Sequence, residues 1–512
     1  ARCLAWLDAA ANRLYGSRYN PLYRSGTVTV YLLLVLLLTG LYLLLFYRVG
    51  SPWASVERIT GQPWLGRWIR GVHRFAADLA VVTAAVHAFR MFAQGRSWGR
   101  RTLPWVSGVG LLGLILVSGW TGYVMVWDDF GRMLAVEGAR ILDLLPLFSE
   151  PLGRAFVGER AIPGAFFFLN LFLHIALPIG LGIGLLVHVA RVARPVLLPP
   201  RRAMLWATGL LVATAVAMPV AIAPVADPLR LPELVPVDLF YAFWLPLTLG
   251  APAAWVAAGT AALILLFLLV PRLTRPRPVE LRPASVVDER LCTGCEQCVQ
   301  DCPWTAIAMV ARTDGRGTLV ARVDPRRCVS CGICAGSCAP MGVGPAGRTG
   351  RDQLAAVREF AARHDVGAGE VVVVACARGA GGVAREARFD GAPVLAVDCA
   401  GSLHTSVVEY LVRVGAGGVL VLACPMDDCW NREGTKWLEQ RLFHDREAEL
   451  QARVDRRRVA LELVGLAETG RSTGALRAFR ERIRELEAPA GEGVVDLLLL
   501  CDEPALSEEG AK

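Results

Sequence analysis

Two pairs of histidines with equal spacing constrain this chain most. His73 and His87 are 14 residues apart, His174 and His188 repeat the spacing, and all four lie in long apolar runs. Fourteen residues of α-helix rise ~21 Å and close almost four turns, so each pair faces one side of its helix at two depths. Two such helices facing each other would hold two stacked metal groups, each between two imidazoles. The natural occupant is haem in the core of a helix bundle. The alternative is that each histidine is a satisfied core residue, which does not account for two equal spacings.

The composition is typical of a membrane protein that carries soluble parts. Of the 512 residues 54% are hydrophobic, the mean hydropathy is +0.43, and the arginines behind the net charge of +8 flank apolar runs, which argues against nucleic-acid binding. We predict an all-α bundle of six membrane spans, each near the ~20 residues that cross a bilayer. They lie near 27–47, 72–93, 104–127, 165–190, 203–223 and 240–270. An amphipathic surface helix with Trp6 and Leu7 on its boundary is expected before them.

The arginines also predict the orientation of the bundle. Six spans put both termini on one side of the membrane. That side carries sixteen arginines, in the N-terminal tail and the links 90–101, 191–202 and 272–282, against nine on the other side. Because positive residues are retained in the cytoplasm, we expect the termini and the soluble domains to be cytoplasmic, at the inner membrane of a prokaryote.

Several stretches in the first 275 residues match a known pattern. They read NPLYRSGTVTVYLLLVLLLTGLYLLLFY, WIRGVHRF, VHAFR, SGWTGYVMVW and FLHIALPIGLGIGLLVH. Residues 1–275 thus resemble cytochrome b of the quinol-oxidising cytochrome bc complexes. In that family the second and fourth helices supply the haem ligands. The resemblance implies that His73 and His174 bind an outer, low-potential haem b, and that His87 and His188 bind an inner, high-potential one.

The resemblance also implies residues that surround the two haems. Arg70 and Arg90 stand three residues from a ligand, where the family places partners of haem propionates; the alternative is arginines that snorkel at the membrane edge. Glycines at 14-residue spacing on the first and third helices would let a haem lie flat on the helix. They are Gly40 and Gly122 for the outer haem, and Gly26 and Gly108 for the inner one.

This chain departs from the family's sequence motif at the outer quinol site. The family uses a Pro-Glu-Trp-Tyr motif before a later helix, and this chain has ADPLRLPELVPVDLFYAF. Asp238 replaces the glutamate in an ungapped reading, and Glu233 is the other candidate. Either carboxylate would accept a proton from quinol.

Two runs of cysteines follow a proline- and arginine-rich linker and define a domain over 286–345. Their spacing, C-x2-C-x2-C-x3-C, is that of bacterial ferredoxins with two [4Fe–4S] clusters, in which the fourth cysteine of each run ligates the other cluster. One cluster would use Cys292, Cys295, Cys298 and Cys338, and the other Cys328, Cys331, Cys334 and Cys302. A pair of zinc sites is the alternative. Thirteen of the fourteen cysteines follow residue 291 with such spacings, which favours a reducing compartment.

The last domain, 351–512, alternates helix-like and strand-like runs. Helices are predicted at 351–364 and 404–414, and strands at 371–375, 394–398 and 419–423, which together favour a small doubly wound α/β sheet. A cysteine closes each strand and a fourth follows, so a [2Fe–2S] cluster is predicted at Cys376, Cys399, Cys424 and Cys429. Buried cysteines acting as small hydrophobes are the alternative. The segment VDCAGSLHTSVVEYLVRVGAGGVLVLACPMDDC resembles the small iron–sulfur subunit that links hydrogenase to heterodisulfide reductase. Residues 446–488 are interpreted as charged helices and 494–500 as a further strand.

Together these features predict a membrane-bound electron-transfer subunit. It would connect cytoplasmic clusters, two b haems and quinone within a multi-subunit complex, with a dimer as one alternative for its assembly. A partner would exchange the electrons: a flavoprotein, or a hydrogenase-like or heterodisulfide-reductase-like protein. We expect the ferredoxin domain to be closer to the inner haem than to the outer one, because the soluble domains leave the sixth helix at Pro271 on the side of the inner haem. The alternatives are a quinol-oxidising core with a Rieske or cytochrome c partner, and a haem-stabilised anchor for a soluble redox enzyme.

Overall fold

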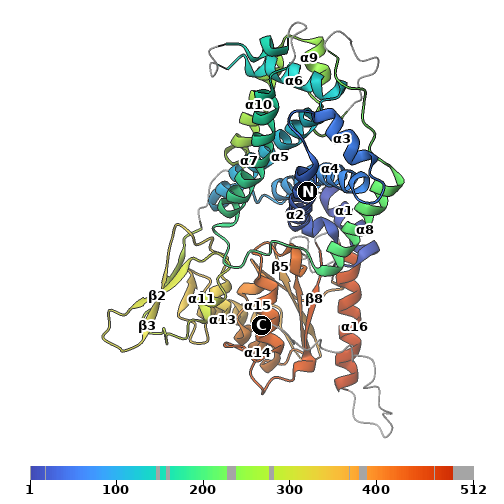
Figure 1. Cartoon of the computed structure of the whole chain (residues 1–512). Coiled ribbons are helices and arrows are strands. Elements are labelled where there is room, and N and C mark those ends of the chain that lie inside the picture. Colours follow the sequence, from blue (N-terminus) through green and yellow to red (C-terminus); the bar gives the residue numbers. More distant parts are fainter. Residues whose placement is uncertain are drawn as a thin grey trace.

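The computed structural model contains a helical bundle above two smaller domains that lie side by side (Figure 1). It describes residues 2–17, 19–145, 150–156, 162–227, 238–275, 282–367, 369–379, 389–465 and 468–487. Glu233, the predicted strand at 494–500 and Cys501 lie outside these residues.

The bundle has five helices in its described part that are long and apolar enough to cross a membrane. They are α2 (Ser25–Phe46), α4 (Gly66–Ala93), α5 (Thr102–Val126), α7 (Gly164–Val189) and α10 (Ala253–Leu273). The sequence predicted six spans, one more than the five such helices among the described residues. Its fifth span forms α8 (Arg201–Ala217), a helix of 17 residues, and its sixth is split into α9 (Leu245–Gly250) and α10. The split falls where Pro252 caps α10, a position at which proline suits the start of a new helix and ends the old one.

The bundle is built from two packed helix pairs. α2 packs along α4, and α5 packs along α7; α8 then packs on α4, and α10 on α5. The short helices α6 (Asp129–Leu142) and α9 lie at the end of the bundle far from the small domains (Figure 1), and α3 (Pro52–Gly61) packs on α4. The two histidine-bearing helices therefore belong to different pairs.

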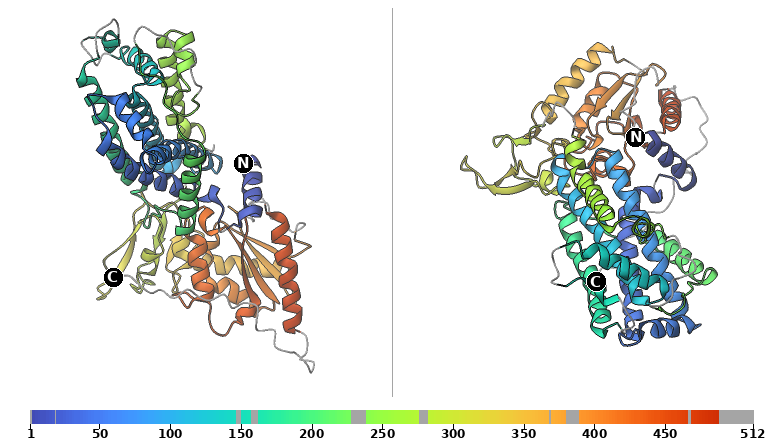
Figure 2. Two further views of the ribbon diagram at one scale, coloured as in Figure 1. Left: turned by 45° about the vertical axis from the view of Figure 1, so that its right-hand side comes forward. Right: turned by 90° about the horizontal axis from the view of Figure 1, so that it is seen from above.

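The predicted surface helix forms α1 (Arg2–Tyr15). Trp6 is 68% exposed and Leu14 is 78% exposed, as expected for a helix that rests on a membrane surface. α1 lies beside α16 (Thr469–Glu487) of the last domain in both views of Figure 2. It therefore stands where the bundle meets the C-terminal domain.

The ferredoxin domain has two small antiparallel sheets and two short helices. β1 (Ser285–Val287) pairs with β4 (Val343–Pro345), and β2 (Ile307–Ala311) pairs with β3 (Leu319–Val323). Helices α11 (Gln297–Gln300) and α12 (Ile333–Gly336) occupy matching places in the two cysteine runs. The repeat in sequence is thus a repeat in structure.

The C-terminal domain is a four-stranded parallel sheet with helices on both faces. Its strands are β5 (Val371–Cys376), β6 (Val394–Val397), β7 (Gly418–Ala423) and β8 (Val459–Leu463), in the order β6-β5-β7-β8. Its helices are α13 (Gly350–Arg363), α14 (Thr405–Arg413), α15 (Gly434–Phe443) and α16 (Thr469–Glu487). The three predicted strands and two predicted helices are confirmed.

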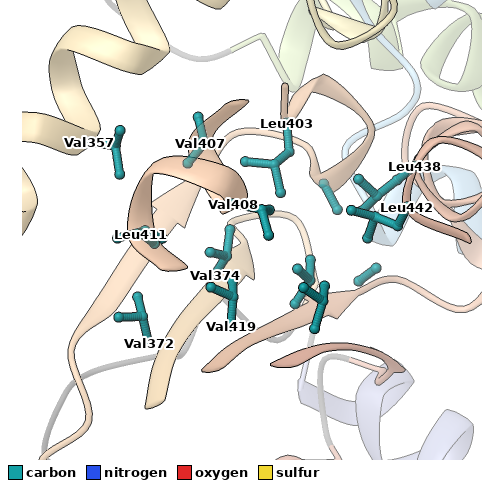
Figure 3. Packing of buried hydrophobic residues seen from close by; sticks show 14 of the residues in the cluster. Val357, Val372, Val374, Leu403, Val407, Val408, Leu411, Val419, Leu438 and Leu442 are labelled. Atoms are coloured by element: carbon teal, nitrogen blue, oxygen red, sulfur yellow. The ribbon is translucent and has the colours of Figure 1, made fainter. Parts of the chain in front are cut away.

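The side chains of the inner strand β5 alternate between the two faces of the sheet and contribute to a hydrophobic core on each face. Val372 and Val374 belong to one hydrophobic cluster with Val357 of α13 and Leu411 of α14 (Figure 3). The odd-numbered valines contact α16 on the other face. The interpretation of 446–488 as helices alone is wrong at 459–463, because VALEL forms the edge strand β8 beside β7 within a highly charged run.

Candidate metal centres

The four predicted histidines meet in two pairs between α4 and α7. The ring centroids of His73 and His174 are 6.5 Å apart, and those of His87 and His188 are 6.4 Å apart. A metal–imidazole bond is about 2.0 Å long and the ring centroid lies about 1.1 Å behind its nitrogen, so two imidazoles on opposite sides of one metal have centroids about 6.2 Å apart. Both separations fit an iron held between two histidines.

Each histidine ring packs against one of the four predicted glycines. The distances from a Cβ placed on the glycine to the nearest ring atom are 2.8 Å for Gly26 and His87, 3.3 Å for Gly108 and His188, 3.4 Å for Gly40 and His73, and 3.1 Å for Gly122 and His174. A side chain at these positions would push the imidazole away from the partner ring. The absence of a side chain at these glycines therefore lets each imidazole ring pack directly against the neighbouring helix.

Three of the rings also hydrogen-bond through Nδ1 to a hydroxyl on the residue that precedes the glycine. The distances are 2.8 Å to Thr39 from His73, 2.9 Å to Thr121 from His174, and 3.1 Å to Ser107 from His188. His174 Nδ1 also donates to the carbonyl of Ser118 at 3.0 Å, which leaves its Nε2 unprotonated and able to bind a metal. These hydroxyls were not among the residues predicted from the sequence. Their signal is present, because a serine or threonine precedes all four glycines.

Replacing Gly26 by alanine is expected to remove haem from the inner site only. The new methyl group would lie 2.8 Å from the His87 ring, and relieving such overpacking costs about 1–3 kcal/mol. Pyridine haemochrome spectra should fall from two haems per chain to one. Gly113→Ala is the matched control, since nothing lies within 4 Å of a Cβ there. Full haem content in Gly26→Ala would contradict the role given to this glycine.

The two arginines predicted to face propionates already have protein partners. Arg70 Nη1 donates to the carbonyl of Val220 at 2.8 Å. Arg90 is 2% exposed and forms ion pairs with Asp8 and Asp428, the latter at 3.0 Å. Arg90 therefore connects the end of α4 to the C-terminal domain.

Asp238 lies at the far end of the bundle in a fixed position. Its Oδ1 accepts the backbone N–H groups of Phe240 at 2.8 Å and Tyr241 at 2.7 Å, and its Oδ2 lies 2.9 Å from Arg74. Burial raises the pKa of this carboxyl, but the hydroxyl of Tyr123, the backbone donors and Arg74 outweigh it, so the pKa is lowered. A carboxylate held ionised by these contacts is a weak base, which favours a structural role.

The cysteines predicted for the first ferredoxin cluster line one pocket. Cys292, Cys295, Cys298 and Cys338 face it together with apolar side chains such as Val287 and Met309. Among the described residues, no three His, Cys, Asp or Glu side chains could hold a single metal ion. A [4Fe–4S] cube instead binds four thiolates at four separate irons. Cys295 is exposed, so this centre reaches the surface of the domain.

The second predicted set, Cys302, Cys328, Cys331 and Cys334, lies deeper. Burial raises the pKa of Cys334 to about 12, so its thiolate requires a positive partner such as iron. Backbone N–H groups also point at these sulfurs: Ala306 donates to Cys302 Sγ and Ser285 to Cys328 Sγ, both at 3.4 Å. Such donors stabilise thiolate ligands.

The two cysteine loops share an unusual backbone. Positive φ angles occur at Gly294 (80°) and Glu296 (64°) in the first loop, and at Ser330 (58°) and Gly332 (80°) in the second. A non-glycine residue with positive φ is strained, and such strain clusters at binding sites. Both loops are therefore folded alike, and each would place three thiolates on three corners of one cluster.

The last four cysteines converge at the carboxyl ends of the parallel strands. Cys376 and Cys424 have sulfurs 3.7 Å apart, and the thiols of Cys399 and Cys429 are hydrogen-bonded to each other; all four are buried. A Cβ on Gly434 would lie 2.8 Å from Cys399 Sγ, so glycine is required beside the site. Hydrogen bonds from their partner thiols lower the pKa of Cys376 and Cys429, which favours thiolates. This donor set fits an iron–sulfur cluster.

Residues 427–433, called the junction loop here, join this four-cysteine site to the bundle. The loop contains Cys429, and its contacts come from four separate segments of the membrane domain. They are Arg24 to Asp427 at 2.6 Å, Arg90 and Gln94 to Asp428 at 3.0 and 2.9 Å, Arg101 to the Trp430 carbonyl at 2.8 Å, and Arg194 Nε to Glu433 at 3.0 Å.

The ferredoxin domain touches the bundle less extensively. Arg194 Nη1 donates to the carbonyl of Gln300 at 2.6 Å, and the backbone of Ala193 donates to Pro303 at 3.1 Å. These contacts involve the link that follows His188, so the ferredoxin domain lies at the same end of the bundle as His87 and His188, as expected. The acidic junction loop of the C-terminal domain pairs with Arg90, three residues from His87, because it complements the basic links at this end of the bundle.

Comparisons with known proteins match the three parts of the chain separately. Residues 11–196 match the cytochrome b/b6/petB family, residues 291–342 the 4Fe-4S dicluster domain, and residues 367–487 the delta subunit of methyl-viologen-reducing hydrogenase. The chain is thus a fusion of a cytochrome b domain, a dicluster ferredoxin domain and a hydrogenase delta-subunit domain, as the sequence resemblances predicted.

Two curated relatives each match about a third of this chain. The menaquinol:cytochrome c reductase cytochrome b subunit of Geobacillus thermodenitrificans is 28% identical over 190 residues, 34% of this chain and 84% of that protein. Its counterpart in Bacillus subtilis (strain 168) is 29% identical over 169 residues, 31% of this chain and 75% of that protein. A solved structure, "Hyperthermophilic respiratory Complex III", is similar with a TM-score of 0.40 and 17% identity over 49% of this chain and 75% of that one. Cytochrome b similarity and five apolar helices make this a membrane protein of the electron-transfer type.

Proposed function

We propose that the chain passes electrons between cytoplasmic iron–sulfur clusters, two b haems and the quinone pool, as one subunit of a larger redox complex. The junction loop is the observation that carries this function. It bonds the segment around Cys429 to Arg90, which is one helical turn from His87. When bound, the haems and clusters accept and donate single electrons.

The ligands in this proposal follow the pairs and groups described above. The outer haem is held by His73 and His174, and the inner haem by His87 and His188. Hydroxyl and carbonyl acceptors orient the imidazoles, and the glycines keep the rings close to the facing helix. The cysteine sets hold two [4Fe–4S] clusters and one [2Fe–2S] cluster.

The order of the soluble centres follows from their contacts. A Cβ on Gly332, between Cys331 and Cys334, would lie 2.8 Å from Ser402, in the loop that begins at Cys399. Cys331 and Cys334 of the second set therefore lie close to the four-cysteine site, whereas the exposed Cys295 of the first set lies beside Glu447 of the C-terminal domain. Electrons would pass from a soluble partner at Cys295 through both ferredoxin clusters and the four-cysteine site to the inner haem, or in reverse. The partner is a flavoprotein, or a hydrogenase-like or heterodisulfide-reductase-like protein.

A quinol-oxidising core with a Rieske or cytochrome c partner is the second candidate. It is favoured by the relatives, whose name is that of a menaquinol:cytochrome c reductase subunit. The contacts of Asp238 with Arg74 and backbone donors speak against that residue as the proton acceptor on the outer side. Asp238 or Glu233 as a quinol base stays a prediction from the sequence, as does the cytoplasmic location of the soluble domains.

The test is quinone reduction by the purified complex with a low-potential donor. We expect donor oxidation to be coupled to the appearance of quinol, and the coupling to be lost when the haem ligand His87 is replaced by leucine. Turnover that requires a copurifying Rieske protein would support the second candidate. A complex that never exchanges electrons with quinone would show that the haems only stabilise an anchor.

A further inference from the structure

The arginine that the sequence offers for the inner haem is already occupied. Arg90 has both ends of its guanidinium on carboxylates, Asp8 and Asp428, and lies 4.9 Å over the ring of Tyr23. A buried bidentate arrangement of this kind leaves little donor capacity. A haem between His87 and His188 carries two propionates that need other cationic partners at the same end of the bundle.

Two other arginines at this end have free donors. Arg96 donates from Nη2 to the carbonyl of Asp428 at 3.1 Å, whereas its buried Nε has no hydrogen-bond partner. The side chain of Arg432 makes no hydrogen bond or ion pair with any residue that the structure describes, and it keeps exposed surface. A buried N–H without a partner, such as Arg96 Nε, is rare in a native protein and indicates an anion or other acceptor beside it.

Arg432 stands between the two cofactor sites. It follows Cys429 by three residues, and its backbone N–H donates to the Cys429 carbonyl at 2.9 Å. Its backbone has a φ of 70°, a strained conformation that the loop maintains. Its charge lies within electrostatic range of both the His87 ring and the Cys429 sulfur.

The charges around the junction loop are not balanced among the described side chains. Seven arginines touch or belong to the loop: Arg24, Arg90, Arg96, Arg101, Arg194, Arg378 and Arg432. Four carboxylates face them: Asp8, Asp427, Asp428 and Glu433. The excess of positive charge fits two propionates beside the thiolate-ligated cluster, since a buried charge needs a counter-charge.

We propose that Arg432 of the C-terminal domain, together with Arg96, binds the propionates of the inner haem. The inner haem site is then built from two domains, whereas the outer site belongs to the bundle alone. This inference rests on the proposed function, because it requires haem at His87 and His188. Its consequence is that docking of the C-terminal domain sets the reduction potential of the inner haem and of no other.

The test is a potentiometric titration of both haems in membranes that contain the full chain. Arg432→Gln removes one positive charge near the inner haem, so its reduction becomes less favourable. We expect the equilibrium constant for reducing the inner haem to fall at least tenfold, which is a midpoint about 59 mV lower for one electron. The outer haem should not change. Arg432→Lys should restore most of the shift, and Arg482→Gln, on an exposed face of α16, is the control.

The outcomes separate this inference from the proposed function. An inner-haem midpoint that is the same in Arg432→Gln and Arg482→Gln would overturn the role of Arg432 while two haems are still present. Haem content that does not change in His87→Leu would instead show that no haem is bound at His87, and the proposed function would fail with it.

Discussion

Replacing Cys424 and Cys429 together by serine is expected to remove one cluster and leave the others. Cys424 is 3.7 Å from Cys376, and the Cys429 thiol pairs with Cys399, so the double variant removes one thiolate from each pair. Electron paramagnetic resonance of reduced samples should lose the [2Fe–2S] signal and retain those of [4Fe–4S] clusters. Cluster iron should fall from about ten atoms per chain to about eight, from two [4Fe–4S] and one [2Fe–2S] centre.

The control for this variant is Cys3→Ser, because Cys3 belongs to none of the predicted ligand sets. A [2Fe–2S] signal that persists in the double variant would contradict the ligand assignment. Loss of the [4Fe–4S] signals as well would show that the four-cysteine site and the ferredoxin domain depend on each other for folding.

Replacing Arg441 by methionine is expected to destabilise the contact between the two soluble domains. Arg441 and Asp301 are both fully buried and lie 3.6 Å apart, and Arg441 also donates to the Ser337 hydroxyl at 3.0 Å and to the Gly401 carbonyl at 2.8 Å. Asp301 and Ser337 each precede the fourth cysteine of a ferredoxin run. Removing one partner of a buried ion pair costs up to about 3–5 kcal/mol, and the closer pair of Asp301 with Arg446, at 2.5 Å, reduces this cost.

The measurement for this variant is the thermal unfolding midpoint of the detergent-solubilised chain with its clusters. Arg453→Met is the matched control, because Arg453 is 73% exposed in its pair with Glu409, and exposed pairs contribute about 0–1 kcal/mol. The midpoint should fall clearly in Arg441→Met and hardly in the control. Equal midpoints would mean that Arg441 does not hold the domains together.

The sequence predicts best where one physical period dominates. The 14-residue spacing of the histidines predicted the two pairs of rings, because fourteen residues close almost four turns of an α-helix and return to the same face. The ferredoxin domain was predictable because its cysteine spacing is highly specific. The strands β5 and β7 were predictable because both are continuous apolar runs buried on two faces.

The sequence predicts poorly where a partner distant in the chain decides. Arg90 is a reasonable propionate partner until Asp428, 338 residues away, pairs with it. The edge strand β8 is hidden because VALEL lies within a charged run and is only half-buried against β7. The hydroxyls that bind three imidazoles were present in the sequence, yet serine and threonine in helices usually bond their own backbone, so their role needed the facing helix.

The central claim is that electrons enter the membrane from the four-cysteine site through the inner haem. The direct measurement is stopped-flow reduction of the complex by a low-potential donor, with His87→Leu compared with His73→Leu. The account predicts that the inner haem is reduced before the outer one, that His87→Leu leaves the clusters reduced and the outer haem oxidised, and that His73→Leu leaves reduction of the inner haem intact. Rapid reduction of the outer haem in His87→Leu, with loss of transfer in His73→Leu, would contradict it.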